Sequence, residues 1–363
     1  MSRHTLATVV ALGSLACYGP YREPPLPPPP LATLPPVRLS PSGATLQDQV
    51  SGTTARLQAI SAVNDQIVWA SGTGGTFVVT INGGLSWRAG IVAGADSLEF
   101  RDVHGVDART AWLLASGPGT KSRIYRTIDG GQNWQIQFIN RTPEAFYDCF
   151  AFWDQKNGIA WSDNVGGRFP YLVTADTGQT WEQRYLDGAT EGEGAFAASG
   201  TCVIALGKQV AWVATGAGKE ARLFSTADRG KSWTHVSTPI VQGSSTTGHT
   251  SIAFWSPNDG IAVGGDIGVA DSWTDNVVVT HDGGLTWKLG TRPTFAGAVF
   301  GVVTVPGTQP RFVAVGPKGA AVTRDDGTTW QPLDTLSYWS AGFATPQAGW
   351  LVGPQGRITQ VKF

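Results

Sequence analysis

One octapeptide, Ser/Thr-x-Asp/Asn-x-Gly-x-x-Trp, recurs six times in this chain and constrains its fold more than any other feature. Its opening threonines are separated by 47, 47, 52, 54 and 43 residues; they are Thr80, Thr127, Thr174, Thr226, Thr280 and Thr323. A unit that recurs every roughly 40 to 55 residues is typical of a repeat architecture. Within the unit, Asp or Asn accepts backbone N–H hydrogen bonds, Gly supplies a positive φ, and Trp covers a β-hairpin.

This octapeptide is the Asp-box, a motif that indicates a fold and says little about function. Its carboxylate or amide closes a turn at the edge of a repeat, so we expect a structural role and no catalytic role for it. The residues concerned are Asn82, Asp129, Asp176, Asp228, Asp282 and Asp325.

The segments around each octapeptide predict four short strands. Two β-branched or aromatic runs and a Gly-rich hairpin lead to a third run such as Thr76–Thr80, and a fourth run starts near the octapeptide Trp. The second run ends near a tryptophan in five repeats, at Trp69, Trp112, Trp161, Trp212 and Trp350. Four antiparallel strands per repeat, arranged radially, make a β-propeller blade.

The end of the chain predicts a seventh blade that is closed by the N-terminal side. Residues 340–363 contain three predicted strands and no octapeptide. The missing fourth strand is expected from residues 44–50, because pairing the two chain ends removes exposed sheet edges. The sequence therefore predicts an all-β fold: a seven-bladed propeller over residues 44–363.

The N-terminus has the pattern of an export signal. Arg3 and His4 precede an apolar run over residues 6–16, which is too short to span a bilayer. We expect a signal peptide over residues 1–16 and a lipid anchor on Cys17, although Ser14 stands where lipoprotein signals usually have Leu. A Pro-rich linker over residues 17–43 is expected to be an extended spacer, with a docking ligand for a proline-binding domain as the alternative. These features predict an exported protein, lipid-anchored in a bacterial cell envelope or otherwise secreted.

The repeat pattern resembles that of the photosystem II stability/assembly factor family of seven-bladed propellers. The resemblance rests on the Gly-x-x-Gly hairpins, as in Gly316–Gly319, and on the octapeptides, and it covers about residues 44–363. It implies a non-catalytic scaffold at the cell envelope whose partner is a membrane-associated protein. No basic patch of that family can be assigned, because Lys and Arg are scattered singly along this chain.

The main alternative is a carbohydrate-active propeller, either a sialidase-like glycoside hydrolase or a lectin, because Asp-boxes also occur in those proteins. Sialidases carry an Arg-Ile-Pro signature before their first Asp-box, whereas the similar Arg168-Phe169-Pro170 follows two octapeptides here. We therefore expect Arg168 to be a hairpin residue, and no pair of carboxylates is placed for catalysis.

Other kinds of chemistry have little support in the sequence. The formal net charge is -1, which argues against a nucleic-acid partner. The five histidines show no metal-ligand spacing, and the Gly-rich segments lead into strands, so we expect neither a metal nor a cofactor.

Aligning the blades on their tryptophans brings several residues to the starts of the inner strands. Cys149 and Cys202 reach matching places in adjacent blades, where either a disulfide or two separate buried thiols is expected. The starts of inner strands line one mouth of the central channel, where propellers usually hold ligands. The partner-binding candidates near that mouth are Arg101, Asp102, Tyr147, Asp148, His249 and Trp339.

Overall fold

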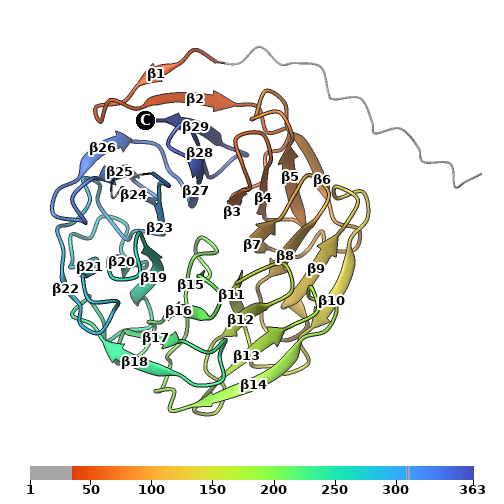
Figure 1. Ribbon diagram of the computed structural model, residues 1–363, viewed down its shortest axis with the longest axis vertical. Helices are drawn as coiled ribbons and strands as arrows, with labels where there is room; N and C mark the ends of the chain where they lie inside the picture. The colour runs from red at the N-terminus through yellow and green to blue at the C-terminus, as the bar shows by residue number, and fades with distance from the viewer. Residues whose placement is uncertain (1–34, 308, 310) are drawn as a thin grey trace, which may run out of the picture.

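The computed structural model describes residues 35–307, 309 and 311–363, and its strands form seven sheets around a common centre (Figure 1). Within these residues the single helical element is a 3-10 turn, η1 (Gly119–Lys121). None of the helical structure in this part of the chain is long and apolar enough to cross a membrane. The prediction of an all-β, seven-bladed propeller is confirmed.

The two innermost strands of each blade form the core of the ring. The inner strands are β3 (Leu57–Ala62), β7 (Phe100–Gly105), β11 (Tyr147–Phe152), β15 (Val203–Leu206), β19 (Thr247–Phe254), β23 (Gly301–Thr304) and β27 (Ser340–Thr345). The second strands are almost wholly buried; they are β4 (Val68–Gly72), β8 (Ala111–Ala115), β12 (Gly158–Ser162), β16 (Val210–Ala214), β20 (Gly260–Asp266), β24 (Phe312–Gly316) and β28 (Ala348–Val352).

The two outer strands complete each blade. The third strands are β5 (Thr76–Thr80), β9 (Arg123–Thr127), β13 (Arg168–Thr174), β17 (Arg222–Thr226), β21 (Val277–Thr280), β25 (Gly319–Thr323) and β29 (Ile358–Lys362). The fourth strands are more exposed; they are β6 (Arg88–Ile91), β10 (Gln135–Ile139), β14 (Glu182–Asp187), β18 (Thr234–Ser237), β22 (Lys288–Leu289), β26 (Gln331–Asp334) and, in the seventh blade, β2 (Thr45–Gln49).

The alternating strand directions give the ring two different faces. All neighbouring strands pair antiparallel, so the inner strands begin where the second strands end. We call this side the mouth face. The octapeptides connect third strands to fourth strands and lie on the other side, which we call the octapeptide face.

The N-terminal strand closes the ring as predicted. Strand β2 pairs with β29 in the register Leu46 to Val361, and the two chain ends therefore share one sheet (Figure 1). A short strand β1 (Arg38–Leu39) adds a fifth strand to this blade, inside the range that was expected to be linker. Arg38 explains the extension, because its guanidinium pairs with Asp48 at 3.2 Å and with Asp334 of the sixth blade at 3.1 Å.

Gln49 at the end of β2 locks the seventh blade to the first. Its Oε1 accepts hydrogen bonds from the indole N–H of Trp87 (3.0 Å) and of Trp350 (3.2 Å). Its Nε2 donates to the carbonyl of Gly83 (3.4 Å). Gln49 is 7% exposed, so these polar groups leave water together and satisfy one another.

The octapeptide turns are built in the same way in all six copies. In the second copy, the Thr127 hydroxyl donates to Asp129 (2.8 Å) and accepts from the Gly131 N–H (2.9 Å). The same aspartate accepts from the N–H of Asn133 (2.9 Å). These bonds are local, and the turn is further tied to the hairpin between the first two strands of its blade, as where the Gly130 N–H donates to the Arg109 carbonyl (2.9 Å).

The glycine at the fifth position of the octapeptide also lets neighbouring blades approach closely. Gly178 and Gly284 have φ of 68° and 82°. A Cβ atom would lie 2.7 Å from the Trp112 indole nitrogen at Gly178 and 2.2 Å from the Trp212 ring at Gly284. The tryptophan of one blade thus packs beneath the octapeptide turn of the next, and Gly is required for both dihedral and space.

Two inner strands are joined covalently. Cys149 of β11 and Cys202, just before β15, form a disulfide that links the third blade to the fourth, with Cα atoms 5.9 Å apart and a sequence separation of 53. Both residues are fully buried. The sequence left open either a disulfide or two separate buried thiols, and the structure has the disulfide.

Candidate functional site

A long connection between the third and fourth blades fills the centre of the mouth face. This central loop, residues 188–202, joins β14 to β15 and projects into the middle of the ring (Figure 1). The six residues from Ala195 to Gly200 are mostly buried, although they contain no strand. Since a loop is buried only where its polar groups find partners, its contacts explain its position.

The central loop contacts blades on every side of the channel. Its Ala197 carbonyl accepts from Arg101 of the second blade (3.3 Å), and its Ser199 carbonyl accepts from Ser340 of the seventh (2.9 Å). The Thr201 hydroxyl lies 2.6 Å from that of Ser251 in the fifth. The loop therefore blocks the central channel at this end and becomes the floor of the mouth face.

A pocket of about 440 Å³ lies beside the central loop. It is bounded by the second to fifth blades and by the loop itself. Its lining is rich in ionisable groups; the residues are Arg101, Glu144, Phe146, Asp148, Asp163, Asn164, Gly192, Glu193, Ala195, Phe196, Ala197, Ala217 and Ser245. We call this the mouth pocket.

Two buried carboxyl groups meet at the base of the mouth pocket. Asp148 is 1% exposed, and its Oδ2 receives no hydrogen bond from any donor among the described residues. Asp163 lines the same pocket and is near enough to act on its pKa, so the two carboxyl groups titrate together and one of them keeps a proton near neutral pH. Burial, followed by the charge of Asp163, raises the pKa of Asp148 well above its usual range. Burial raises the pKa of Asp163 to about 7.

The central loop holds this carboxyl pair in place. The Ala195 N–H donates to Asp163 Oδ1 (3.0 Å), and a Cβ atom on Gly194 would lie 2.0 Å from the same oxygen. Glycine is therefore needed where the loop passes over Asp163. A pair that shares a proton can release it, or can accept a cation in its place.

Glu193, which also lines the pocket, is already held in an ion pair within the fold. It forms a buried ion pair with Arg222 and accepts from the hydroxyl of Thr215 (2.8 Å). Burial would raise the pKa of Glu193, but the bonds from Arg222 and the Thr190 N–H outweigh burial and lower that pKa. This pair anchors the central loop to the fourth blade.

A chain of stacked and paired side chains runs from the seventh blade to the mouth pocket. The Arg56 guanidinium lies 4.5 Å from the ring centre of Trp339 and 3.6 Å from the carboxylate of Glu99. Glu99 also pairs with Arg101 at 2.7 Å. Trp339 packs edge-on against Phe300, with ring centres 4.9 Å apart. We call Trp339, Arg56, Glu99 and Arg101 the mouth strip; all four are at least partly exposed.

Three of the six predicted partner-binding residues are internal, and the prediction that they offer contact surface is corrected here. Asp102 is buried and accepts from the N–H groups of Val103 (2.7 Å) and Phe150 (2.8 Å). Tyr147 lies in the core against Phe138, and His249 is fully buried with Nε2 2.7 Å from the Thr238 hydroxyl. Burial lowers the pKa of His249 to about 3, so its ring is neutral.

The other three candidates, Arg101, Asp148 and Trp339, lie on the mouth face as expected. Sequence reasoning missed Asp163 and Glu193 because both lie outside the inner-strand starts. One signal was available for Glu193, since the spacing of 52 residues between Thr174 and Thr226 reveals extra chain before the fourth blade.

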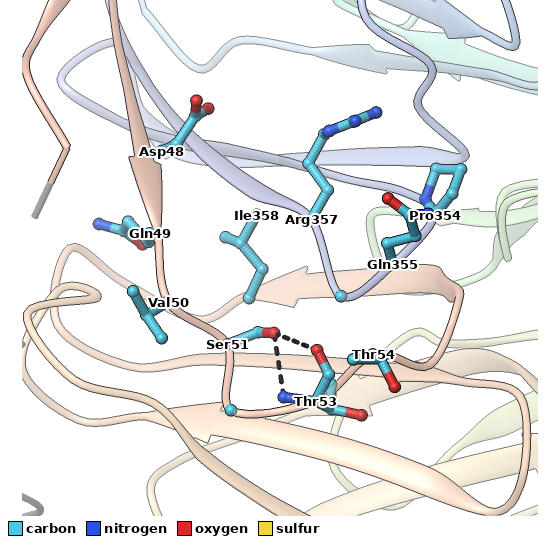
Figure 2. Close-up of a pocket in the computed structure, with 12 residues that line it drawn as sticks. Asp48, Gln49, Val50, Ser51, Thr53, Thr54, Pro354, Gln355, Arg357 and Ile358 are labelled. Atoms are coloured by element: carbon cyan, nitrogen blue, oxygen red, sulfur yellow. Dashed lines mark hydrogen bonds between the residues drawn. The ribbon is translucent and has the colours of Figure 1, made fainter.

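A second pocket, of about 780 Å³, lies where the ring closes (Figure 2). It is lined by residues 48–54, which pass from β2 to β3, and by residues 354–358. Its walls are largely turns that satisfy themselves, as where Ser51 Oγ accepts from the Thr53 N–H (3.3 Å). Arg357 already donates to the Ser337 carbonyl (2.8 Å). We interpret this pocket as a consequence of ring closure and propose no function for it.

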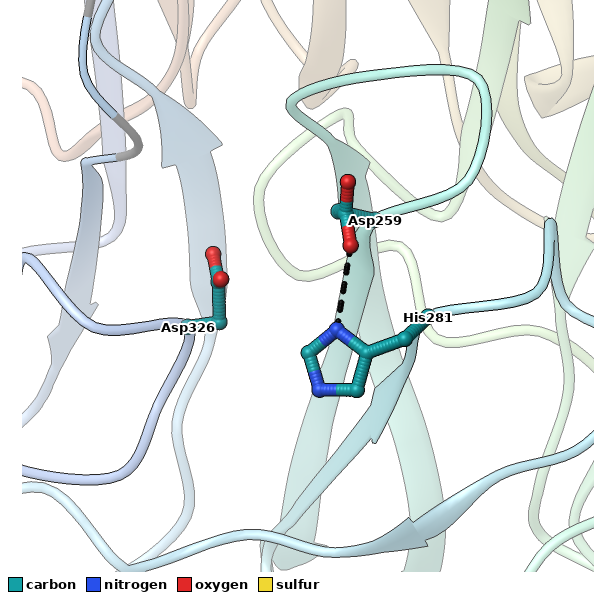
Figure 3. A group of neighbouring side chains, drawn as sticks. All are labelled: Asp259, His281 and Asp326. Carbon is teal, nitrogen blue, oxygen red and sulfur yellow. Dashed lines mark hydrogen bonds and ion pairs between the residues drawn. The ribbon is translucent and has the colours of Figure 1, made fainter.

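One cluster on the octapeptide face has side chains that suit a metal ion. Asp259, His281 and Asp326 offer one nitrogen and two carboxylate oxygens within 4.8 Å of one another (Figure 3). The sequence predicted no metal site, because these residues are far apart in the chain. His281 Nδ1 already pairs with Asp259 at 3.0 Å, and the group is largely exposed.

The equivalent position two blades earlier carries an ion pair instead. Arg229 and Asp326 both follow the aspartate of an octapeptide, and both have positive φ, at 62° and 53°. Arg229 pairs with Asp154 of the preceding blade at 3.2 Å, whereas Asp326 faces Asp259. Burial, followed by the charge of Asp259, raises the pKa of Asp326.

The sialidase-like tripeptide lies apart from the mouth pocket lining. Arg168 begins β13 next to the turn after β12, is exposed, and stacks on Tyr185 at 4.7 Å from the ring centre. It therefore has the position of a hairpin residue.

No protein-family model and no curated protein sequence matches this chain. Solved structures do match it. YCF48 bound to a D1 peptide has 13% sequence identity and a TM-score of 0.57, over 91% of this chain and 100% of that chain. YCF48 from Cyanidioschyzon merolae has 14% identity and a TM-score of 0.58, over 87% of this chain and 98% of that chain.

An ancestral GH74 enzyme is similar to the same degree. It has 13% identity and a TM-score of 0.59, and the match covers 85% of this chain and 45% of that enzyme. An assembly factor and a glycosidase thus give nearly equal scores. The likeness extends to the propeller fold, and the choice between functions must come from the site.

Proposed function

We propose that this protein is a non-catalytic, Asp-box-type β-propeller that binds a segment of a protein partner on its mouth face. The partner is a membrane-associated protein of the cell envelope, as the resemblance to photosystem II assembly factors suggests. The similar YCF48 structure, which holds a peptide of D1, supports a peptide-binding role for such a ring.

One observation carries this proposal. The mouth pocket and the mouth strip lie side by side through Arg101, and they combine exposed aromatic surface with charged groups. Recognition surfaces for peptides characteristically mix aromatic and Arg side chains with placed polar groups. The buried Asp148 Oδ2, which has no donor among the described residues, is a costly feature that ring stability does not require.

Site-specific photocrosslinking tests the proposal. A photoreactive residue replaces Glu144 or Ser245, both exposed at the mouth pocket, or Leu285, which is 78% exposed on the octapeptide face. We expect one discrete crosslinked envelope protein from the first two positions and none from the third. Crosslinking from Leu285 alone would move the partner to the other face and defeat the proposal.

We also propose that the protein is exported and anchored by a lipid on Cys17, a residue that lies outside the described part of the chain. The lipoprotein-like segment that ends at Cys17 supports this location. Cys17→Ser should release the protein from membranes without changing its melting temperature, because the anchor and the propeller are separate in sequence. If the wild-type protein is not labelled by a radioactive fatty acid, it has no lipid anchor and is secreted instead.

A carbohydrate-active propeller is the second candidate, and the similar GH74 enzyme supports it. The geometry of the mouth pocket counts against hydrolysis. Paired glycosidase carboxyls stand about 5 to 9.5 Å apart to leave room for substrate or water. Asp148 is instead 1% exposed, and burial raises the pKa of both Asp148 and Asp163, so the pair is not arranged as an acid beside an ionised nucleophile or base. Turnover of any glycoside that is lost in Asp163→Asn would establish this candidate.

A further inference from the structure

The acidic groups of the mouth pocket differ in how far they are already neutralised. Glu193 is paired with Arg222, and the Arg101 guanidinium is paired with Glu99 and with the Ala197 carbonyl. Asp148 and Asp163 each have the other carboxyl group as a neighbour. The charge of Arg101 reaches Asp148, but Arg101 is already paired with Glu99, so among the described residues no cation is committed to this carboxyl pair alone.

Asp148 supplies the observation that points to a ligand. Its side chain is 1% exposed, it lines the pocket, and its Oδ2 has no donor among the described residues. A buried acceptor without a donor costs about 1 to 3 kcal/mol, so such groups are usually satisfied. A bound group that donates hydrogen bonds would satisfy it.

We propose that the mouth pocket receives a positively charged Arg or Lys side chain of the partner, held by Asp148 and Asp163. This inference rests on the proposed function and names the chemistry that the partner must present. A guanidinium or ammonium group can donate hydrogen bonds to two adjacent carboxylates and offsets one of their two negative charges.

The rest of the pocket suits a long, charged side chain. Phe146 and Phe196 are half-buried in the wall, where they can cover the aliphatic stem of Arg or Lys. Glu144 is exposed at the rim and adds a third negative charge. A bare metal ion fits less well, because no third carboxylate or histidine converges on this pair among the described residues.

Binding of a cation here should depend on pH. The ionisable groups around the pair are Arg101 of β7, Glu144 before β11 and Glu193 of the central loop. The pair shares a proton near neutral pH, and a bound cation must displace it. The affinity therefore rises as pH increases through about 7, and binding releases a proton.

The test uses matched probes that differ only in charge. Acetyl-Gly-Arg-Gly-amide is titrated against acetyl-Gly-citrulline-Gly-amide, which has the shape of arginine without its charge, and binding is measured by NMR chemical-shift changes. We expect the arginine peptide to bind at least tenfold more tightly at pH 8 than at pH 5.5, and the citrulline peptide not to bind. Equal binding of the two peptides would overturn the proposal.

Isosteric variants locate the site. Asp148→Asn and Asp163→Asn imitate the protonated carboxyls and should fold, and each should reduce binding of the arginine peptide at least tenfold. The control Asp129→Asn changes the octapeptide face and should leave binding unchanged. Retained binding in Asp148→Asn with a wild-type melting temperature would overturn the proposal.

The two proposals can fail separately. If the partner still crosslinks from position 144 but the arginine and citrulline peptides bind alike, the cation inference fails and the proposed function stands. If the arginine peptide binds while no envelope protein crosslinks at the mouth face, the proposed function fails. In that case the bound Arg or Lys side chain does not come from an envelope protein partner.

Discussion

The octapeptide face repeats one solution six times, whereas the mouth face is different in every blade. On the octapeptide face, each Asp or Asn bonds to hydroxyls and N–H groups within four residues, as Asp129 does with Thr127 and Asn133. On the mouth face, bonds join residues that are far apart, as between Ser199 and Ser340. The contacts that recur in each blade stabilise the ring, whereas the contacts that occur only once determine the shape of the mouth face.

Asp129 of an octapeptide and Asp163 of the mouth pocket also titrate in opposite directions. Burial alone would raise the pKa of Asp129, but hydrogen bonds from Asn133 and Thr127 outweigh it and lower that pKa. Burial raises the pKa of Asp163 to about 7. The aspartates at the third octapeptide position, such as Asp129 and Asp282, thus favour the charged form, whereas Asp148 and Asp163 favour the protonated form. Hydrogen bonds within the turn stabilise the charged form of Asp129, whereas burial in the mouth pocket stabilises the protonated form of Asp163.

The largest effect is expected from removing the unrepeated strand that closes the ring. Deleting residues 37–52 takes away β1, β2 and Gln49, which should cost on the order of 5 kcal/mol or prevent folding. Deleting residues 20–34 should leave the unfolding midpoint unchanged, since that Pro-rich segment offers little apolar surface to bury. Urea unfolding of both proteins measures the difference, and equal losses would contradict this view of closure.

A smaller but large loss is expected from the ion pair that anchors the central loop. Glu193→Gln leaves the buried Arg222 without its counter-charge, which should cost about 3 to 5 kcal/mol. Glu182→Gln removes the partner of Arg184 on the exposed strand β14 and should cause no measurable loss. Chemical denaturation at pH 7 compares them. If both variants behave alike, the central loop is not held by this pair.

The inner disulfide should come next in size. Replacing Cys149 and Cys202 by Ala removes a link that closes 53 residues and should lower stability by about 2 to 4 kcal/mol. Reduction under denaturing conditions, followed by refolding with blocked thiols, should give the same loss. Two free thiols titrated in unfolded, unreduced protein would show that the residues are not bonded.

The smallest effect should reveal the opposite pH behaviour of the faces. Asp163 has a raised pKa in the folded state, so its contribution to stability is full below pH 4 and is lost as pH rises toward 7. Asp163→Asn should therefore raise stability by about 1 to 3 kcal/mol at pH 8 and change little at pH 4.

The matched variant on the octapeptide face should have the reverse sign. Asp129 has a lowered pKa, so its contribution is present above pH 4 and is lost as pH falls through its folded-state value. Asp129→Asn should lower stability at pH 7, by about 1 kcal/mol at this mostly exposed site, and lose its effect in acid. Thermal melts across pH 3 to 9 measure both variants. Effects of the same sign would erase the contrast between the faces.

The blade plan could be predicted because its signals are local. Each octapeptide contains its own donors, acceptors and covering Trp, and the spacing of the copies sets the number of blades. The closing strand was predictable from an unfinished seventh repeat, because a sheet edge must be paired. The extra strand β1 was missed, since a two-residue strand held by Arg38 leaves no pattern in the sequence.

The mouth pocket could be predicted only in part. Alignment brought Arg101, Asp148 and Trp339 to the mouth face, but it placed Asp102, Tyr147 and His249 there too. Adjacent residues of a strand point to opposite sides, so a position near the mouth does not mean exposure. The central loop then buries much of what remains.

The sequence by itself determined the repeated part of this protein: six turns, seven blades and their tryptophans. These features depend on bonds within a few residues and on a packing unit that each blade copies. Only the tertiary structure decided the pairing of Asp148 with Asp163 and the path of the central loop across the channel. Those contacts join residues that no repeat relates, so their energies exist only after the ring has brought the blades together.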